Sequence, residues 1–142
     1  MLVHEVMNSH VVYANQTESA ARAARLLSRH NIGAVPVLGD KGKLRGIVTD
    51  RDIVLRCIAL ENDPGTTPLR DVMSRCVVTA SPEEDLEAAV KKMTDAQVRR
   101  LPVVDSGRLV GMLSISDLAK NAGSMELSAQ ALSGVTSNMR RL

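Results

Sequence analysis

Aromatic side chains are nearly absent from this sequence, which contains no Trp, no Phe and a single Tyr, Tyr13. Proteins that bind single-stranded nucleic acid usually stack the bases on aromatic rings, so this class is almost excluded. The formal charge is only +2, and the basic residues are scattered among acidic ones. A nucleic-acid footprint needs a basic patch or stripe, and we therefore expect no nucleic-acid partner.

The sequence also lacks a hydrophobic run long enough to cross a bilayer. Its opening, M-L-V-H-E-V-M-N, has no basic segment followed by an apolar core, as secretory leaders have. These features predict a cytoplasmic protein with no membrane partner. Cys57 and Cys76 lie in apolar surroundings without a C-x-x-C spacing, which favours buried reduced thiols.

Metal-ligand and catalytic patterns are missing as well. The three histidines show no metal-ligand spacing. No Ser/His/Asp, Cys/His or paired-carboxylate arrangement is visible, and Thr49 with Asp52 has no neighbouring base to activate a nucleophile. We therefore expect no enzymatic activity.

The most informative feature that is present is an internal repeat. A shift of 66 residues aligns many separated positions, and a one-residue deletion in a turn then changes the shift to 65. The matched pairs include Val6 with Val72, Met7 with Met73, Glu18 with Glu84, Pro36 with Pro102, Gly46 with Gly111 and Asp52 with Asp117. A unit of about 60 residues is marginal alone, so the two copies should form one pseudo-twofold module. The expected organisation is repeat 1 over 1–60, a linker over 61–70, repeat 2 over 71–123 and a tail over 124–142.

Each copy predicts the element order β-α-β-β-α, which places the chain in the α/β (α+β) class. Short β-rich runs occupy residues 10–13 and 76–79. Thr17 and Ser81 are the expected N-caps of the helices that follow, because acidic residues come next. Apolar residues then recur at i, i+3, i+4 and i+7, as on a buried helix face. They are Ala20, Ala23, Ala24 and Leu27 in copy one, and Leu86, Ala89, Val90 and Met93 in copy two.

Two strands and a second helix complete each copy. Pro36 and Pro102 cannot donate a ladder hydrogen bond, so their strands should lie at a sheet edge or begin at the proline. The second helix of copy one carries an apolar stripe formed by Ile53, Val54, Cys57 and Ile58. This stripe is larger than one small module needs inside, and we expect a homodimer with twofold symmetry. Three apolar residues of the tail predict a short docking helix: Leu127, Ala131 and Leu132.

The last strand of each copy runs directly into a helix. The sequence G-I-V-T-D-R-D-I, Gly46 to Ile53, returns as G-M-L-S-I-S-D-L, Gly111 to Leu118, and both keep a hydroxyl residue followed three positions later by aspartate. One interpretation is a helix cap, in which the hydroxyl accepts a backbone N–H and the carboxylate suits the helix dipole. The alternative is a nucleotide site, because α/β proteins commonly bind nucleotides at the carboxyl ends of strands.

The tandem β-α-β-β-α unit, the V-M pair opening each copy, the proline-valine strand and the G-h-h-[ST]-x-x-D ending resemble the cystathionine-β-synthase (CBS) domain pair, or Bateman module. The resemblance runs from about Leu2 to Ala122, and the chain looks like a stand-alone bacterial two-CBS protein. It implies a regulatory module with no required cofactor. The implied ligands are of the adenosine type (AMP, ADP, ATP, S-adenosylmethionine or NAD), bound in clefts between the repeats.

The resemblance also implies roles for individual residues. Asp52 and Asp117 would take the ribose hydroxyls, while Thr49 and Ser114 would help to hold phosphate or ribose. The residues that would enclose adenine are Val11, Val12, Ala34, Val35 and Pro36 in repeat 1, and Val77, Val78, Leu101 and Pro102 in repeat 2. These enclosing residues are also core residues, so substituting them would not separate the two roles.

Basic residues distinguish the two copies. Arg99 and Arg100, in R-R-L-P, resemble a basic pair that reaches phosphate in nucleotide-sensing members, and copy one has Gly-Ala there. Copy one instead has Arg51 where copy two has Ser116. The two sites should therefore differ in charge. The first functional hypothesis is a module that senses adenine nucleotides and regulates an unidentified protein by shifting conformational populations. The alternative is a structural dimerisation or partner-docking protein with unused grooves.

Overall fold

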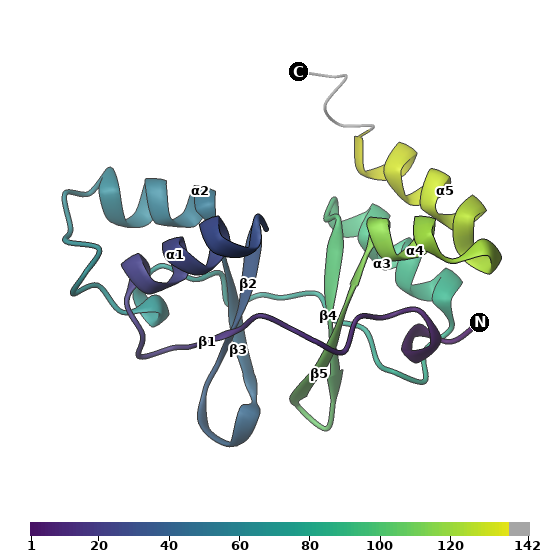
Figure 1. Cartoon of the computed structure of the whole chain (residues 1–142), viewed down its shortest axis with the longest axis horizontal. Coiled ribbons are helices and arrows are strands. Elements are labelled where there is room, and N and C mark those ends of the chain that lie inside the picture. Colours follow the sequence, from purple (N-terminus) through teal and green to yellow (C-terminus); the bar gives the residue numbers. More distant parts are fainter. Residues whose placement is uncertain (137–142) are drawn as a thin grey trace. The chain divides into compact units, whose positions relative to one another are not determined.

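The computed structural model describes residues 1–136 and divides the chain into two compact units (Figure 1). The amino-terminal unit is Val12–Val77, and the carboxy-terminal unit combines Met1–Val11 with the chain from Val78 onward. Both mix helices with strands, so the predicted α/β (α+β) class is confirmed. No helix within residues 1–136 combines the length and the apolar content needed to cross a bilayer.

The amino-terminal unit contains a three-stranded sheet and two helices. Its elements are β1 (Ala14–Asn15), α1 (Ala20–His30), β2 (Ala34–Leu38), β3 (Leu44–Thr49) and α2 (Asp50–Ile53), which continues as a π-helical turn over Val54–Ile58. The sheet order is β1-β2-β3, with β1 parallel and β3 antiparallel to β2. All five residues of β2 are buried, so this central strand lies entirely within the core of the unit.

The carboxy-terminal unit repeats this plan and adds a helix. Its elements are α3 (Leu86–Ala96), β4 (Arg100–Asp105), β5 (Arg108–Ser114), α4 (Ile115–Lys120) and α5 (Met125–Thr136). β4 and β5 form an antiparallel pair. The tail helix predicted after residue 123 is present as α5, whereas residues 137–142 of the predicted tail lie outside the described residues. Of its predicted docking residues, Ala131 is buried and Leu127 packs against the core, but Leu132 is exposed.

The segment that opens each sequence repeat completes the other repeat's core. Near the amino terminus, the amide of Val3 donates to the carbonyl of Glu84 at 2.9 Å. The equivalent bond in the amino-terminal unit runs from Leu69 to Glu18 at 2.8 Å. Each unit therefore contains the opening V-M segment of one repeat and the strands of the other.

The first strand of copy one lies later in the sequence than predicted. The prediction of a strand at 10–13 is wrong, because β1 is Ala14–Asn15, with Ala14 opposite Val37 in parallel register. In this register the amide of residue 36 would have to donate to residue 12 for the ladder to extend backward. Pro36 has no N–H, so pairing begins at Ala14.

Pro36 also contradicts the prediction that its strand lies at an edge or begins at the proline. β2 is the central strand of its sheet and begins two residues earlier, at Ala34. Opposite Pro36, Ile47 exchanges both backbone hydrogen bonds with Ser74 rather than with β2 (3.0 and 2.9 Å). The missing N–H of Pro36 therefore costs no bond to β3.

Copy two has only a single bridge at the equivalent place, so the strand predicted at 76–79 is also wrong. The amide of Ala80 donates to Pro102 at 3.0 Å, and the amide of Val104 donates to Ala80 at 2.8 Å. The next bond would need an N–H at residue 82, which is Pro82. In copy one the equivalent residue, Gln16, does donate, to Leu38 at 2.8 Å.

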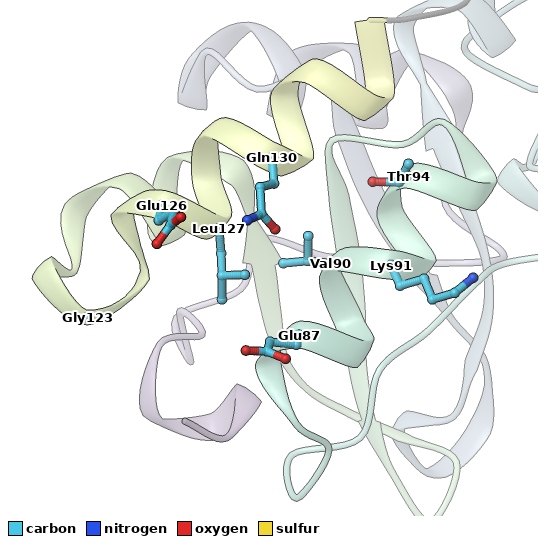
Figure 2. A pocket seen from close by; sticks show the side chains of 8 residues that line it. All are labelled: Glu87, Val90, Lys91, Thr94, Gly123, Glu126, Leu127 and Gln130. Carbon is cyan, nitrogen blue, oxygen red and sulfur yellow. The ribbon is translucent and has the colours of Figure 1, made fainter.

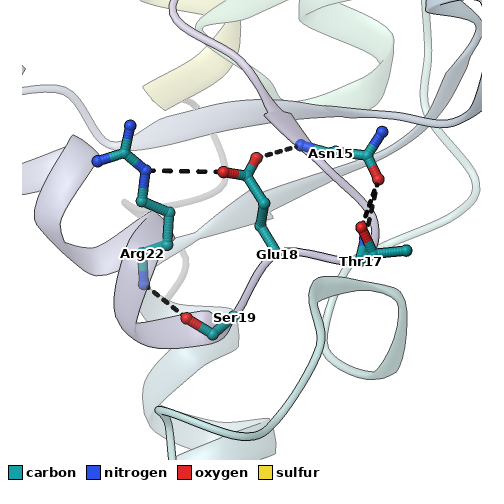
Figure 3. A network of polar contacts seen from close by, with 5 residues as sticks. All are labelled: Asn15, Thr17, Glu18, Ser19 and Arg22. Atoms are coloured by element: carbon teal, nitrogen blue, oxygen red, sulfur yellow. Dashed lines mark hydrogen bonds and ion pairs between the residues drawn. The ribbon is translucent and has the colours of Figure 1, made fainter.

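Helix α1 begins after Ser19, not after the predicted Thr17 (Figure 3). The hydroxyl of Ser19 accepts the amide of Arg22 at 3.1 Å. Thr17 is unavailable because its amide and its hydroxyl both donate to Asn15 Oδ1, at 3.0 and 2.9 Å. Glu18 closes the turn by accepting the amide of Asn15 at 2.6 Å. The polar run thus forms a side-chain-bonded turn before the helix starts.

The predicted helix faces are only partly right. All four predicted positions of α3 are buried, which confirms that face, although α3 begins after Asp85 rather than Ser81. In α1, Ala24 is exposed and Leu26 is buried instead. The prediction of two buried thiols holds for Cys57 and is wrong for Cys76, which is exposed.

Candidate functional site

The strand-to-helix junction of each unit is closed by a reciprocal pair of hydrogen bonds. Thr49 Oγ1 accepts the amide of Asp52 at 3.1 Å, and Asp52 Oδ2 accepts the amide of Thr49 at 2.9 Å. Ser114 and Asp117 repeat the arrangement at 3.1 and 2.9 Å. Two of the free backbone donors around each helix start are satisfied in this way, so the helix-cap interpretation is confirmed.

The capping bonds leave part of each carboxylate available. Asp52 and Asp117 are both half-buried. Among the described residues, no hydrogen bond reaches Oδ1 of either aspartate. An ionised carboxylate offers about four acceptor positions, so each group can serve as a cap and still accept hydrogen bonds from a ligand.

A glycine on the last strand lets a methionine-bearing segment approach each junction. A Cβ at Gly46 would lie 2.6 Å from the carbonyl oxygen of Ser74 and 2.8 Å from Met73 Sδ. At Gly111 it would lie 2.6 Å from Met7 Sδ and 3.1 Å from a backbone oxygen. A side chain at either glycine would displace the methionine-bearing segment from the strand. The methionines were not predicted as site residues, although the V-M pair that opens each copy is visible in the sequence repeat.

The neighbouring strand brings several predicted residues beside each junction. In the amino-terminal unit Ala34 is the cross-strand partner of Thr49. In the carboxy-terminal unit Arg100 is the partner of Ser114, and the carbonyl of Arg99 accepts the amide of Ile115 at 3.0 Å. The residue two positions before the proline of β2 and of β4 therefore lies beside the strand-to-helix junction of its unit.

The predicted adenine-enclosing residues fall into three groups by burial. Those on β2 and β4 are buried: Ala34, Val35, Pro36, Leu101 and Pro102. Those on the first segments are half-buried, namely Val11, Val12 and Val77, whereas Val78 is 39% exposed. The boundary between the two units falls between Val11 and Val12, so these neighbours belong to different units. The buried residues are part of the two hydrophobic cores, as expected for residues that would both pack in the core and enclose adenine.

The arginines differ in how far they are fixed. Arg51, in the first turn of α2, and Arg99 are exposed, and Arg100 is half-buried. None of the three forms an ion pair among the described residues. Their charges are therefore available to an anionic ligand.

A separate cavity of about 530 Å³ lies between α3 and α5 (Figure 2). Its walls carry Glu87, Lys91 and Gln130, but none of the predicted site residues. Lys91 Nζ donates to Asp95 Oδ2 at 2.8 Å, and this hydrogen bond raises the pKa of Lys91. Within residues 1–136 no group of His, Cys, Asp and Glu side chains could hold a metal ion.

The fold and the duplicated helix-start element define a protein built from two related repeats, each with a helix, two paired strands and a second helix. Residues 3–58 and 69–123 both match the CBS domain, and the chain belongs to the CBS domain family. It is 40% identical over 134 residues to the CBS domain-containing protein YhcV of Bacillus subtilis, covering 94% of each chain.

Two solved structures have the same fold. The crystal structure of Hypoxic Response Protein I with two coordinated zinc ions matches with a TM-score of 0.79 and 31% identity, covering 85% of this chain and 98% of that one. A protein of similar name, Hypoxic response protein 1, comes from Mycobacterium tuberculosis. The CBS domain pair of protein MJ0100, in complex with 5'-methylthioadenosine and S-adenosyl-L-methionine, matches with a TM-score of 0.73 and 30% identity, covering 84% and 94%.

Proposed function

We propose that this chain is a regulatory module that binds an adenosyl ligand at its two strand-to-helix junctions. The observation that carries the proposal is the junction itself, which recurs with the same capping geometry in both units and leaves Oδ1 of each aspartate without a hydrogen bond among residues 1–136. The related CBS pair of protein MJ0100, which binds two adenosyl compounds, supports the ligand class.

The aspartates carry the recognition of ribose in this proposal. Asp52 and Asp117 accept hydrogen bonds from the ribose hydroxyls, and Thr49 and Ser114 hold the ribose or its phosphate. A hydrogen bond to a charged group contributes about 1.5–3 kcal/mol net. The residues that enclose adenine are Val11, Val12, Ala34, Val35, Pro36, Val77, Val78, Leu101 and Pro102.

The arginines select the phosphate chain. Arg99 and Arg100 stand beside the junction of the carboxy-terminal unit, and Arg51 follows that of the amino-terminal unit. Because guanidinium binds phosphate through two charge-assisted hydrogen bonds, AMP, ADP and ATP should bind with different strengths at the two junctions. No step of this function requires a catalytic residue or a permanent cofactor.

The ligand acts by changing the population of an assembled state, either a homodimer or a complex with the regulated protein. A second candidate function is assembly alone, without a ligand. It is favoured by an apolar surface on the π-helical turn that continues α2, where Val54 and Ile58 are 54% and 51% exposed.

Titration calorimetry with adenosine, AMP, ATP, S-adenosylmethionine and guanosine tests the proposal. We expect adenosyl compounds to bind and guanosine to bind at least tenfold more weakly. Asp52→Asn should weaken one class of site at least tenfold, because the amide can keep the cap but loses the charge that strengthens the ribose bonds.

The matched control is Asp40→Asn, which removes the same charge at the opposite end of the β2–β3 hairpin. It should bind like the wild type. If no adenosyl compound binds and none is released from freshly purified protein in mass spectrometry, the ligand-binding function is wrong and assembly alone remains.

A further inference from the structure

A lysine on helix α3 binds the segment that leads into this helix. Lys92 Nζ donates to the carbonyl of Thr79 at 2.9 Å and to Glu84 Oε1 at 2.6 Å. The second contact is also an ion pair, in which the lysine side chain is 39% exposed and the glutamate side chain 19% exposed. One ammonium group therefore fixes two points of the chain that precedes α3.

The bond to the carbonyl takes the place of a sheet hydrogen bond that a proline removes. Ala80 lies opposite Val103 in parallel register. The next ladder bond would need the amide of residue 102 to donate to Val78, and Pro102 has no N–H. Among residues 1–136, no backbone hydrogen bond reaches Val78 or Thr79. The lysine bond is therefore the one hydrogen bond in the described chain that ties these two residues to the rest of their unit.

The amino-terminal unit fixes its equivalent segment without a lysine. The residue equivalent to Lys92 is Leu26, which is buried in the core of that unit. The strand β1 pairs with β2 there, so the ladder itself holds the segment. The equivalent of Glu84 is Glu18, whose carboxylate accepts the amide of Asn15 at 2.6 Å (Figure 3). A charged side chain of the carboxy-terminal unit thus does what strand pairing does in the other unit.

We infer that Lys92 is a positioning residue for one of the two ligand sites, the one to which Val78 belongs. The inference rests on the proposed function and adds the group that fixes the shape of this site before the ligand binds. Val78 directly precedes Thr79, and its side chain is 39% exposed and accessible to a ligand. Because the segment approaches β4 in parallel, it comes from the end where Arg100 pairs with Ser114 at the junction.

The affinity of this site depends on the lysine through preorganisation. A segment that is already held in its bound conformation loses less conformational freedom when the ligand binds, and the affinity rises accordingly. The other site uses the segment that β1 and β2 fix by strand pairing. Loss of the lysine should therefore weaken one site and leave the other unchanged.

The glutamate decides how the lysine can be removed in a test. Glu84 Oε2 is buried and has no hydrogen-bond partner among the described residues. Removing Lys92 alone would leave this carboxylate buried without its counter-charge, which is strongly destabilising. A variant that tests positioning must therefore also remove the charge of Glu84.

Titration calorimetry with adenosine on a matched pair of variants tests the inference. Glu84→Gln keeps an acceptor for the ammonium group and the bond to Thr79, so both sites should stay within about twofold of the wild type. Adding Lys92→Met to Glu84→Gln keeps the length of the side chain, leaves no unpaired charge and removes that bond. This double variant should bind adenosine about tenfold more weakly at one site and within about twofold of the wild type at the other.

Two further variants separate positioning from charge. Lys92→Arg should keep the affinity within about threefold, because guanidinium can donate to both the carbonyl and the carboxylate. Lys91→Met removes the same charge one residue away on α3, where the lysine side chain is 76% exposed and pairs with Asp95. It should change the affinity of neither site.

Hydrogen exchange locates the effect in the structure. The amide of Ala80, which donates to Pro102, should exchange at least tenfold faster in the double variant and recover when adenosine is saturating. The amide of Ala89 in α3, which donates to Asp85, should keep its protection. This pattern is expected if the lysine holds the segment, and a general loss of stability would expose both amides together.

Unchanged binding at both sites in the double variant would overturn the inference, and Lys92 would then serve the stability of the fold alone. Equal losses at both sites, or a double variant that no longer unfolds cooperatively, would also overturn it, because the effect would not be confined to one site. A wild type that binds no adenosyl compound would overturn the proposed function and this inference with it. The wild-type titration therefore distinguishes that failure from a failure of Lys92 alone.

Discussion

The two units share one arrangement of strands and helices. They differ where a single residue changes the strand pairing or where one extra helix covers a face. The amino-terminal unit completes β1 because Gln16 can donate to Leu38, whereas Pro82 limits the carboxy-terminal unit to one bridge. The carboxy-terminal unit covers its helix pair with α5, and the amino-terminal unit leaves its pair bare. The difference teaches that a duplicated sequence pattern preserves the core and the helix-start junction, while edges and faces are free to specialise.

The largest expected effect concerns where each unit begins. A fragment of residues 12–77 should unfold cooperatively in urea, because it contains its whole core cluster, although a unit of this size will be only marginally stable. A fragment of residues 1–60 should not fold, since it lacks the buried Leu69, Val72 and Met73. Losing one such side chain costs about 2–5 kcal/mol. Circular dichroism of both fragments measures this, and equal folding would contradict the exchange of opening segments.

A methyl group added at Gly46 or at Gly111 compares the two units where a neighbouring segment contacts the last strand. Gly46→Ala should cost about 2–3 kcal/mol in free energy of unfolding, because the new Cβ meets a backbone oxygen at 2.6 Å. Gly111→Ala should cost about 1 kcal/mol, since its nearest neighbour is the flexible side chain of Met7. Gly65→Ala, in an exposed loop, should change stability by less than about 0.5 kcal/mol. Equal costs for the first two variants in urea titrations would show that backbone contact does not set the difference.

The phosphate proposal predicts a smaller, ligand-dependent effect. Arg100→Ala should weaken ATP binding about tenfold and adenosine binding by less than about twofold, because only ATP carries the charges that a guanidinium binds. It should also flatten the dependence of ATP affinity on salt. Arg108→Ala, at the opposite end of the same strand pair, is the control and should alter neither. Calorimetry that finds equal losses of affinity for adenosine and ATP would mean that Arg100 contributes to the shape of the pocket and does not bind phosphate.

The smallest effect tests the difference between β1 and the single bridge. Pro82→Gln restores the N–H that copy one has at Gln16, and this amide should donate to Val104 as Gln16 donates to Leu38. We expect a new amide protected at least tenfold from hydrogen exchange at residue 82, with a stability change below about 1 kcal/mol. An unprotected amide would show that something other than the proline ends the ladder.

Much of the fold follows from the sequence because the repeat shows each local pattern twice. The face of α3 was predicted fully, since its four apolar positions all meet the core. The face of α1 was predicted incorrectly at Ala24, which lines a groove between α1 and α2 that no further helix of this unit covers within the described residues. Periodicity indicates which residues are apolar, but whether another helix covers them is a tertiary property that local sequence does not contain.

The candidate site divides in the same way. The capping bonds of Thr49 and Asp52 follow from residue types at a fixed spacing, and they were predictable. The contact of Gly46 with Ser74 was not, because it depends on the exchange of opening segments between repeats. The N-cap Ser19 was missed because several polar residues compete there, and only their mutual hydrogen bonds select one.

The central claim is that the two junctions are the two ligand sites, and calorimetric stoichiometry on a set of aspartate variants tests it most directly. The variants are Asp52→Asn, Asp117→Asn and the double substitution, each titrated with adenosine and AMP, with Asp40→Asn as the charge-matched control. The account predicts two sites per chain in the wild type and the control, one in each single variant and none in the double variant, all with cooperative thermal unfolding. A double variant that still binds two equivalents with wild-type affinity would contradict the account, and these aspartates would then be helix caps and nothing more.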